Sequence, residues 1–118
     1  MYEPKLSTWF VNIAYDVDEF ETCLQIIDIA TKLYPDSPRN FYYKGRSLAA
    51  LGQHEQAIEM LIKASERYGF KPLGVYALEF AVDSCNALVA LGQPPHPMHA
   101  EILQHFHKTK EIVDAQSK

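Results

Sequence analysis

The sequence has little of what marks several common classes of protein. Two cysteines in 118 residues, Cys23 and Cys85, are too few for a disulfide-stabilised scaffold, and both are predicted to be small apolar side chains of the core. No apolar run reaches the roughly 18 residues of a membrane span. The N-terminus lacks the basic start and apolar stretch of a secretory signal. These absences predict a soluble cytoplasmic protein with no membrane partner.

Positive charge is also scarce. Eleven Lys and Arg residues are set against 15 Asp and Glu residues, which gives a formal net charge of -4. Nucleic-acid binding depends on clustered positive charge, because the phosphate backbone supplies most of the affinity. The charge balance therefore predicts that nucleic acid is not a partner.

Catalytic motifs are missing as well. The sequence contains no glycine-rich phosphate loop, no nucleophile elbow and no His-Glu-x-x-His helix. Four histidines lie between His96 and His107, but His96 falls in a proline-rich turn, and no carboxylate or cysteine completes a metal-ligand set. The prediction is a protein that is not an enzyme and has no metal and no cofactor. An enzyme or metal-binding protein built on these histidines is an alternative.

An internal repeat is the main feature that is present. Pro4, Pro38 and Pro72 are spaced 34 residues apart. The same shift superposes three further pairs of identical residues: Glu21 and Glu55, Ala30 and Ala64, and Tyr34 and Tyr68. A period of this length is typical of proteins built from stacked helical units.

Each unit predicts two helices. The first unit predicts helices over about 4–15 and 19–33. The second predicts one that begins at Pro38, capped by Ser37, and ends at Gly52, and another that ends at 68–69. In the third unit the Leu-Gly-Gln turn at 91–93 follows the one at 51–53 after 40 residues, which predicts an elongated helix over about 73–91 and a last helix over about 97–113. The chain is thus predicted to be one all-α domain over residues 1–118, with units of about 4–37, 38–71 and 72–113 and a polar tail at 114–118.

The segment from Phe41 to Ala64 resembles the tetratricopeptide repeat (TPR) family. The resemblance is carried by these residues: Phe41, Gly45, Leu48, the turn Leu51-Gly52-Gln53, Ala57, Leu61 and Ala64. It implies a right-handed superhelix of about six antiparallel helices in three helix-turn-helix units. It also implies that the first helix of each unit lines a concave groove.

Positions that line the groove in the family predict a partner-binding site here: Asn12, Tyr15, Arg39, Tyr42, Arg46, Tyr76, Phe80 and Asp83. The third-unit members assume a register counted from Pro72. Counted from Gly92, that unit offers a different set: Glu79, Val82, Asn86 and Val89. Phe41 and Tyr43 are predicted to belong to the core, whereas Tyr42 and Arg46 are predicted to line the groove. Tyrosine and arginine are the residue types that anchor protein interfaces.

One function of the family can be compared residue by residue. TPR domains that bind the acidic C-terminal tails of heat-shock chaperones hold the carboxylates with Lys, Asn and Arg side chains. The corresponding positions here are Thr8, Asn12, Tyr43, Leu73 and Ala77, and among them only Asn12 matches. The resemblance therefore implies that such tails are not partners.

Together these observations predict a non-enzymatic protein-protein interaction module. It is expected to bind a peptide or an amphipathic helix of another protein in its concave groove, as an adaptor, scaffold or assembly chaperone. Two alternatives stay open. One is a small acidic chaperone of a type III secretion system, and the other is a self-assembling, homo-oligomeric structural protein.

Overall fold

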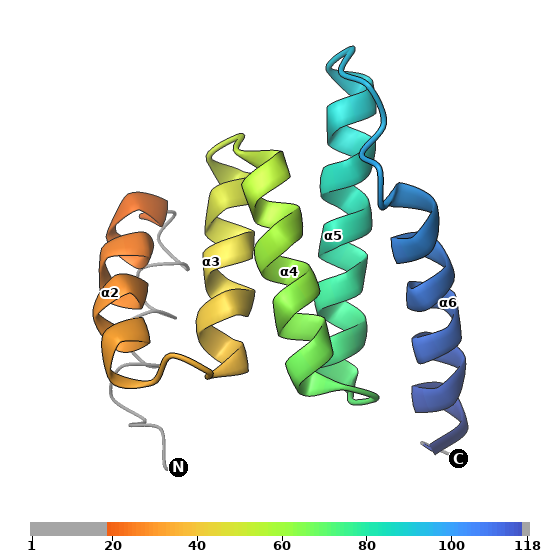
Figure 1. Ribbon diagram of the computed structural model, residues 1–118, viewed down its shortest axis with the longest axis horizontal. Coiled ribbons are helices and arrows are strands. Elements are labelled where there is room, and N and C mark those ends of the chain that lie inside the picture. The colour runs from red at the N-terminus through yellow and green to blue at the C-terminus, as the bar shows by residue number, and fades with distance from the viewer. Residues whose placement is uncertain (1–18, 117–118) are drawn as a thin grey trace.

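The computed structural model describes residues 19–116, and its regular elements are all α-helices within that range. They are α2 (Phe20–Leu33), α3 (Pro38–Ala50), α4 (His54–Tyr68), α5 (Pro72–Ala90) and α6 (His99–Gln116). Figure 1 shows them side by side in one row, each running opposite to its neighbour in the chain. The predicted all-α class is confirmed. The first predicted helix, at about 4–15, lies outside the described residues.

The elongated helix of the third unit is confirmed, since α5 has 19 residues and begins at Pro72. The last helix differs from its prediction at both ends. It begins at His99, because the His96 carbonyl and ring Nδ1 accept hydrogen bonds from the backbone N–H groups of His99 and Met98, at 3.0 and 3.1 Å. It continues to Gln116, so residues 114–116 of the predicted polar tail are helical.

The two Leu-Gly-Gln sequences form the same turn. Gly52 and Gly92 have positive φ angles of 82° and 80°, which a residue with a side chain rarely adopts. The N–H of Gln53 donates to the carbonyl of Leu48 at 2.9 Å, and that of Gln93 donates to the carbonyl of Leu88 at 3.0 Å. This is the hydrogen-bond pattern of a glycine-terminated helix. Each motif therefore ends the first helix of a pair and returns the chain antiparallel to it.

The core lies along α3, α4 and α5. Gly45 of α3 lies against α4, where an added Cβ would be only 2.6 Å from the Cγ of Leu61. The small and apolar residues that carry the repeat pattern in α4 are fully buried: Ala57, Ile58, Leu61 and Ala64. Small side chains at the contact let α3 and α4 pack closely. Helix α4 packs as extensively against α5 as against α3.

Helix α5 also has the length and composition of a membrane-spanning helix, although the sequence shows no uninterrupted apolar run. Its mean hydropathy is 1.3 over the most apolar window. Within the stack, 44% of that window is buried, with Ala77, Ala81 and Cys85 fully enclosed. The core helix of a soluble protein passes the same test of length and composition, so one such helix is weak evidence for a membrane span.

Thr109 is the buried polar residue with the clearest expected effect. It is 1% exposed in α6, and its hydroxyl has no hydrogen-bond partner among the described residues. A buried hydroxyl without a partner costs about 1 to 3 kcal/mol. We expect Thr109→Val to raise the free energy of unfolding by about 1 kcal/mol in a urea titration.

Thr31→Val is the matched control for that substitution. The hydroxyl of Thr31 donates to the Ile27 carbonyl at 2.7 Å, so the same change removes a hydrogen bond and should give no gain in stability. A Thr109→Val protein that is less stable than the parent would contradict the interpretation.

Candidate protein-binding surface

The predicted groove residues that the structure describes belong to two helices. Arg39 lies on α3 and is exposed, while Tyr76 and Asp83 lie on α5 and are exposed. Tyr42 and Arg46 of α3 contact Phe80 of α5. Asn12 and Tyr15 lie outside the described residues.

Three of these side chains form a contact between the first helices of the second and third units. The rings of Tyr42 and Phe80 meet edge to face, with centroids 6.1 Å apart. The guanidinium carbon of Arg46 lies 4.4 Å from the centre of the Phe80 ring, and its Nη1 donates to the Tyr42 hydroxyl at 3.4 Å. A guanidinium over an aromatic face is attracted by the ring quadrupole. We call these three side chains the aromatic-arginine cluster.

The three side chains of this cluster differ in how much of their surface is exposed to a partner. Tyr42 is only 6% exposed and packs in the core, against the Tyr68 ring at 6.3 Å as well as Phe80. The structure thus places Tyr42 in the core, where the sequence had favoured a groove position. The physical reason is that α3 and α5 contact each other directly, which closes the space around this ring. Arg46 and Phe80 are half-buried.

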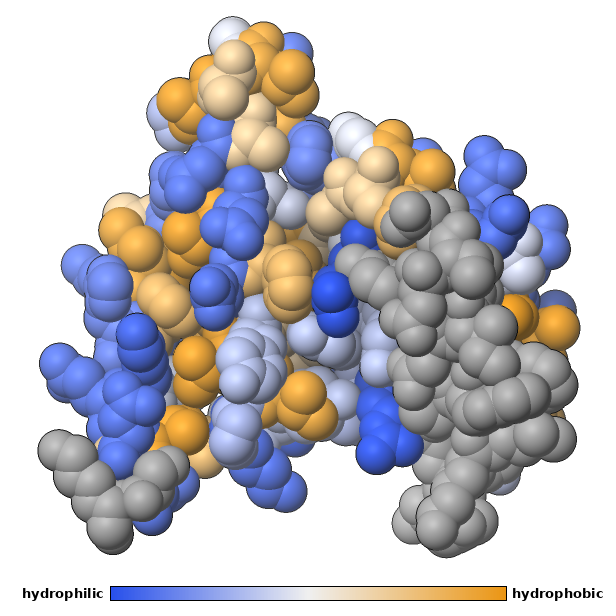
Figure 2. Space-filling model, turned by 180° about the vertical axis from the view of Figure 1, so that it is seen from behind, coloured by the Kyte–Doolittle hydropathy of each residue, from blue (hydrophilic) through white to orange (hydrophobic). Residues whose placement is uncertain are grey.

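The rest of α5 extends this surface. Tyr76, Phe80 and Asp83 are spaced by four and three residues and therefore share one face of the helix. Tyr76 is 51% exposed, and Leu73 one turn earlier is 39% exposed. Figure 2 shows the molecule from behind, with apolar atoms gathered along α5 and between α5 and α6. This face combines apolar contact area with exposed charges of both signs.

Two grooves beside α6 were not predicted from the sequence. One, of about 300 Å³, lies between α5 and α6 and includes Tyr76 among its lining residues. The other, of about 330 Å³, is lined from α4, α5 and α6 by Ile62, Leu78 and Ile102 at its base. One feature of the sequence could have pointed to the groove between α5 and α6. A shift of the second unit by 34 residues places Glu79 where the second unit has Gly45.

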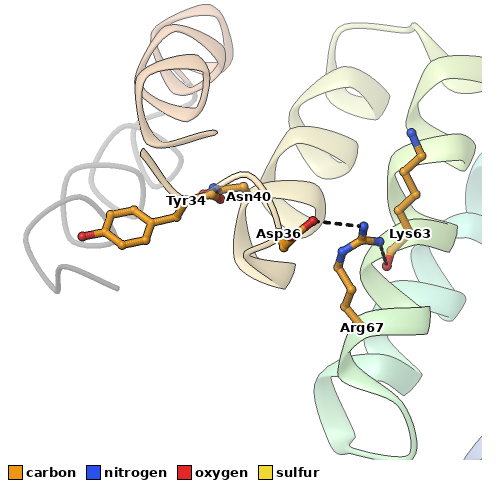
Figure 3. A network of polar contacts seen from close by, with 5 residues as sticks. All are labelled: Tyr34, Asp36, Asn40, Lys63 and Arg67. Atoms are coloured by element: carbon orange, nitrogen blue, oxygen red, sulfur yellow. Dashed lines mark hydrogen bonds and ion pairs between the residues drawn. The ribbon is translucent and has the colours of Figure 1, made fainter. Parts of the chain in front are cut away.

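A polar network fixes the turn between the first two units (Figure 3). The Nδ2 of Asn40 donates to the Tyr34 carbonyl at 2.9 Å, and Arg67 of α4 approaches the Asp36 carboxylate at 3.7 Å. The guanidinium of Arg67 also lies 4.4 Å from the centre of the Phe41 ring. Asp36 is 93% exposed, so its ion pair contributes little stability. The hydrogen bond and the ion pair connect this turn to α3 and α4.

The histidines near the proline-rich turn do not form a cluster with other ligands. His96 and His99 line a shallow hollow of about 410 Å³ together with proline, alanine and leucine side chains. Within residues 19–116, no group of three His, Cys, Asp or Glu side chains is placed to hold a metal ion.

The two thiols are enclosed, which predicts low reactivity. Cys23 and Cys85 are both 0% exposed. Burial raises the pKa of both thiols above the ordinary value of 9.0, and the neighbouring Ser47 side chain opposes this in part at Cys23. We expect neither to react with a thiol reagent at pH 8 until the protein unfolds, since the thiolate is the reactive form. Rapid labelling of the native protein, followed by mass spectrometry, would contradict this.

The same raised pKa values predict how stability changes in alkali. The folded protein holds these thiol protons more tightly than the unfolded chain does, so the stabilisation is complete below pH 9.0 and is lost as pH rises above that value. Replacing both cysteines by alanine should reduce the alkaline loss of stability, measured as the shift in the urea midpoint between pH 8 and pH 10.

No protein-family model matches the sequence, and no curated protein is significantly similar to it.

Proposed function

We propose that this protein is a TPR-like, non-enzymatic interaction module of the cytoplasm. It binds a peptide or a helix of another protein on the face formed by α3 and α5, and it acts as an adaptor, scaffold or assembly chaperone. The aromatic-arginine cluster is the observation that carries the proposal, because it joins the first helices of successive units into one continuous surface. Such a shared surface is what the TPR resemblance implies for a binding groove.

The exposed residues around the cluster suggest the chemistry of the partner. Arg39 on α3 and Asp83 on α5 are exposed charges of opposite sign, and the half-buried Phe80 ring lies on α5, one turn before Asp83. A segment with an apolar side chain for the Phe80 region and an acidic and a basic side chain for Arg39 and Asp83 would match this surface. Charges at the rim of an interface contribute chiefly to specificity and to the association rate.

The small, acidic character of the chain also supports a narrower version of this function. A chaperone of a type III secretion system would hold an amphipathic helix of a secreted subunit on the same surface. The net charge of -4 is the feature that favours it. Both versions predict a protein ligand on α3 and α5, and they differ only in the identity of that ligand.

The test is selection of binding peptides from a displayed library against the full chain, followed by titration of a selected peptide. Arg39→Glu and Asp83→Lys each reverse an exposed charge on the proposed surface. Each is expected to weaken the peptide by about tenfold or more, which corresponds to about 1.4 kcal/mol. Isothermal titration calorimetry measures the dissociation constants.

Matched controls carry the same charge changes on other helices. Lys32→Glu lies on α2 and Glu55→Lys on α4, and both side chains are exposed. These variants should bind the peptide as the parent does. The proposal fails if the peptide binds the control variants more weakly than the parent. It also fails if both surface variants bind the peptide as tightly as the parent does.

A further inference from the structure

The groove between α5 and α6 forms the open side of the last helix pair. It has a volume of about 300 Å³. Its lining is as follows: Pro72, Val75, Tyr76 and Glu79 from α5, and Phe106, Lys110, Val113 and Asp114 from α6. Val75 and Val113 are each 8% exposed, whereas Tyr76 is 51% exposed. The groove therefore has an apolar floor beneath a wide aromatic and charged rim.

The two helix pairs differ at a position that is equivalent when each is counted from its first proline. Both α3 and α5 begin with a proline at their first position, so Gly45 and Glu79 are each the eighth residue of their helix. Gly45 lets α4 come close to α3, because its missing Cβ leaves room for Leu61. Glu79, at the equivalent place counted from the proline, is exposed and lines the groove, and α6 packs against α5 less extensively than α4 packs against α3.

In the preceding helix pair, the corresponding side of α3 and α4 is covered by the next helix of the chain. Helix α5 itself packs against both α3 and α4, with most of its contact to α4. Among the described residues, no helix takes the corresponding position on α5 and α6. Tyr76, which lines the groove, is left 51% exposed there. Its apolar area favours burial by another helical surface.

The charges on the rim favour one particular occupant. Lys110 and Asp114 are four residues apart and share one face of α6, and Glu79 adds a second acid from α5. Two antiparallel copies of such a helix place each lysine opposite the other copy's aspartate. A patch with both signs on one helix face is thus complementary to itself under two-fold symmetry.

We propose that this face binds a second copy of the same chain, and that Lys110 of each copy pairs with Asp114 of the other around a two-fold axis. Helices of 18 and 19 residues are about 28 Å long. Two of them side by side present an area of the order of the 800 Å² per partner that a standard interface buries. The exposed aromatic ring of Tyr76 then becomes part of the dimer interface.

The test measures the mass of the full chain by light scattering, at concentrations from about 1 µM to about 100 µM, where interfaces of this size associate. The parent should approach twice the chain mass of 13.5 kDa. Lys110→Glu leaves three acidic side chains and no lysine on the rim of each copy. In a dimer of Asp114→Lys, two lysines of one copy would face two lysines of the other. Each variant should therefore dimerise at least tenfold more weakly.

Mixing the two variants is the decisive measurement. In a mixed dimer each Lys110→Glu chain meets an Asp114→Lys chain, and both cross-pairs regain opposite charges. We expect two proteins that are monomeric alone to form a heterodimer when combined. Circular dichroism of each variant should match the parent, and the charge-matched variants Lys32→Glu and Glu55→Lys should dimerise normally.

Three outcomes would overturn the proposal. They are a parent that stays at 13.5 kDa up to about 100 µM, variants that dimerise as the parent does, and a mixture that remains monomeric. A monomeric parent that binds a helical peptide in this groove would assign it to another protein. These results are distinct from a failure of the proposed function, since peptide binding is tested at Arg39 and Asp83 on the face of α3 and α5.

Discussion

Replacing Leu61 with alanine is expected to lower the free energy of unfolding by about 4 kcal/mol, within the range of about 2 to 5 kcal/mol for buried leucines. Leu61 is 0% exposed and lies where α4 meets α3, against Gly45. Its removal loses the transfer free energy of the side chain. It also leaves a cavity, because the surrounding helices can collapse only in part. A urea titration followed by circular dichroism measures the change.

Leu33→Ala is the control of matched chemistry. Leu33 ends α2 and is 62% exposed, so the same three carbon atoms are removed from a position that is mostly in water. The expected change is within about 0.5 kcal/mol, as for most surface substitutions. Both proteins should be compared at one concentration, since association of the folded chain raises apparent stability. Equal losses at the two positions would show that Leu61 is not part of a closely packed core.

Gly45→Ala is expected to destabilise the protein by about 1 to 2 kcal/mol, although alanine favours a helix over glycine by about 1 kcal/mol. The new Cβ would lie 2.6 and 2.9 Å from the Cγ and Cδ2 of Leu61 and 3.2 Å from the Ala57 carbonyl oxygen. Leu61 is fully enclosed and cannot turn away without disturbing its neighbours. The steric cost therefore exceeds the gain in helix propensity.

A double-mutant cycle separates this explanation from a general weakness of the helix. In a Leu61→Ala background the Cγ and Cδ2 atoms are absent, so Gly45→Ala should become neutral or stabilising. The coupling between the two changes is expected to be at least about 1 kcal/mol. Strictly additive effects would show that the contact between Gly45 and Leu61 does not set the distance between α3 and α4.

Much of the helical organisation followed from local sequence signals. Pro38 and Pro72 stand at the first positions of α3 and α5, where the missing N–H is no loss. Gly52 and Gly92 end helices in the left-handed conformation that glycine readily adopts. Ser37 lies at the predicted cap position, but its side chain makes no capping hydrogen bond there. Such signals act over a few residues, so they were visible without any knowledge of packing.

The candidate surface was only partly predictable, because exposure depends on neighbours that are distant in sequence. Phe80 contacts Tyr42 and Arg46, the residues with which the sequence grouped it. The sequence did not show that the Tyr42 ring would be enclosed by Tyr68 and Phe80. Nor did it show that Tyr76 would lie in a groove shared with α6.

The sequence by itself determined an all-helical chain with helix pairs, turns at the Leu-Gly-Gln motifs and a long α5, because periodicity and terminal residues are local properties. The tertiary structure alone decided which side chains remain on the surface. Small residues let α3 and α4 pack closely, and the Tyr68 and Phe80 rings enclose Tyr42, whereas α6 packs less extensively on α5 and leaves a groove between them. The distance between packed helices depends on both partners at once, and that is why the open groove and its exposed Tyr76 emerged only from the folded protein.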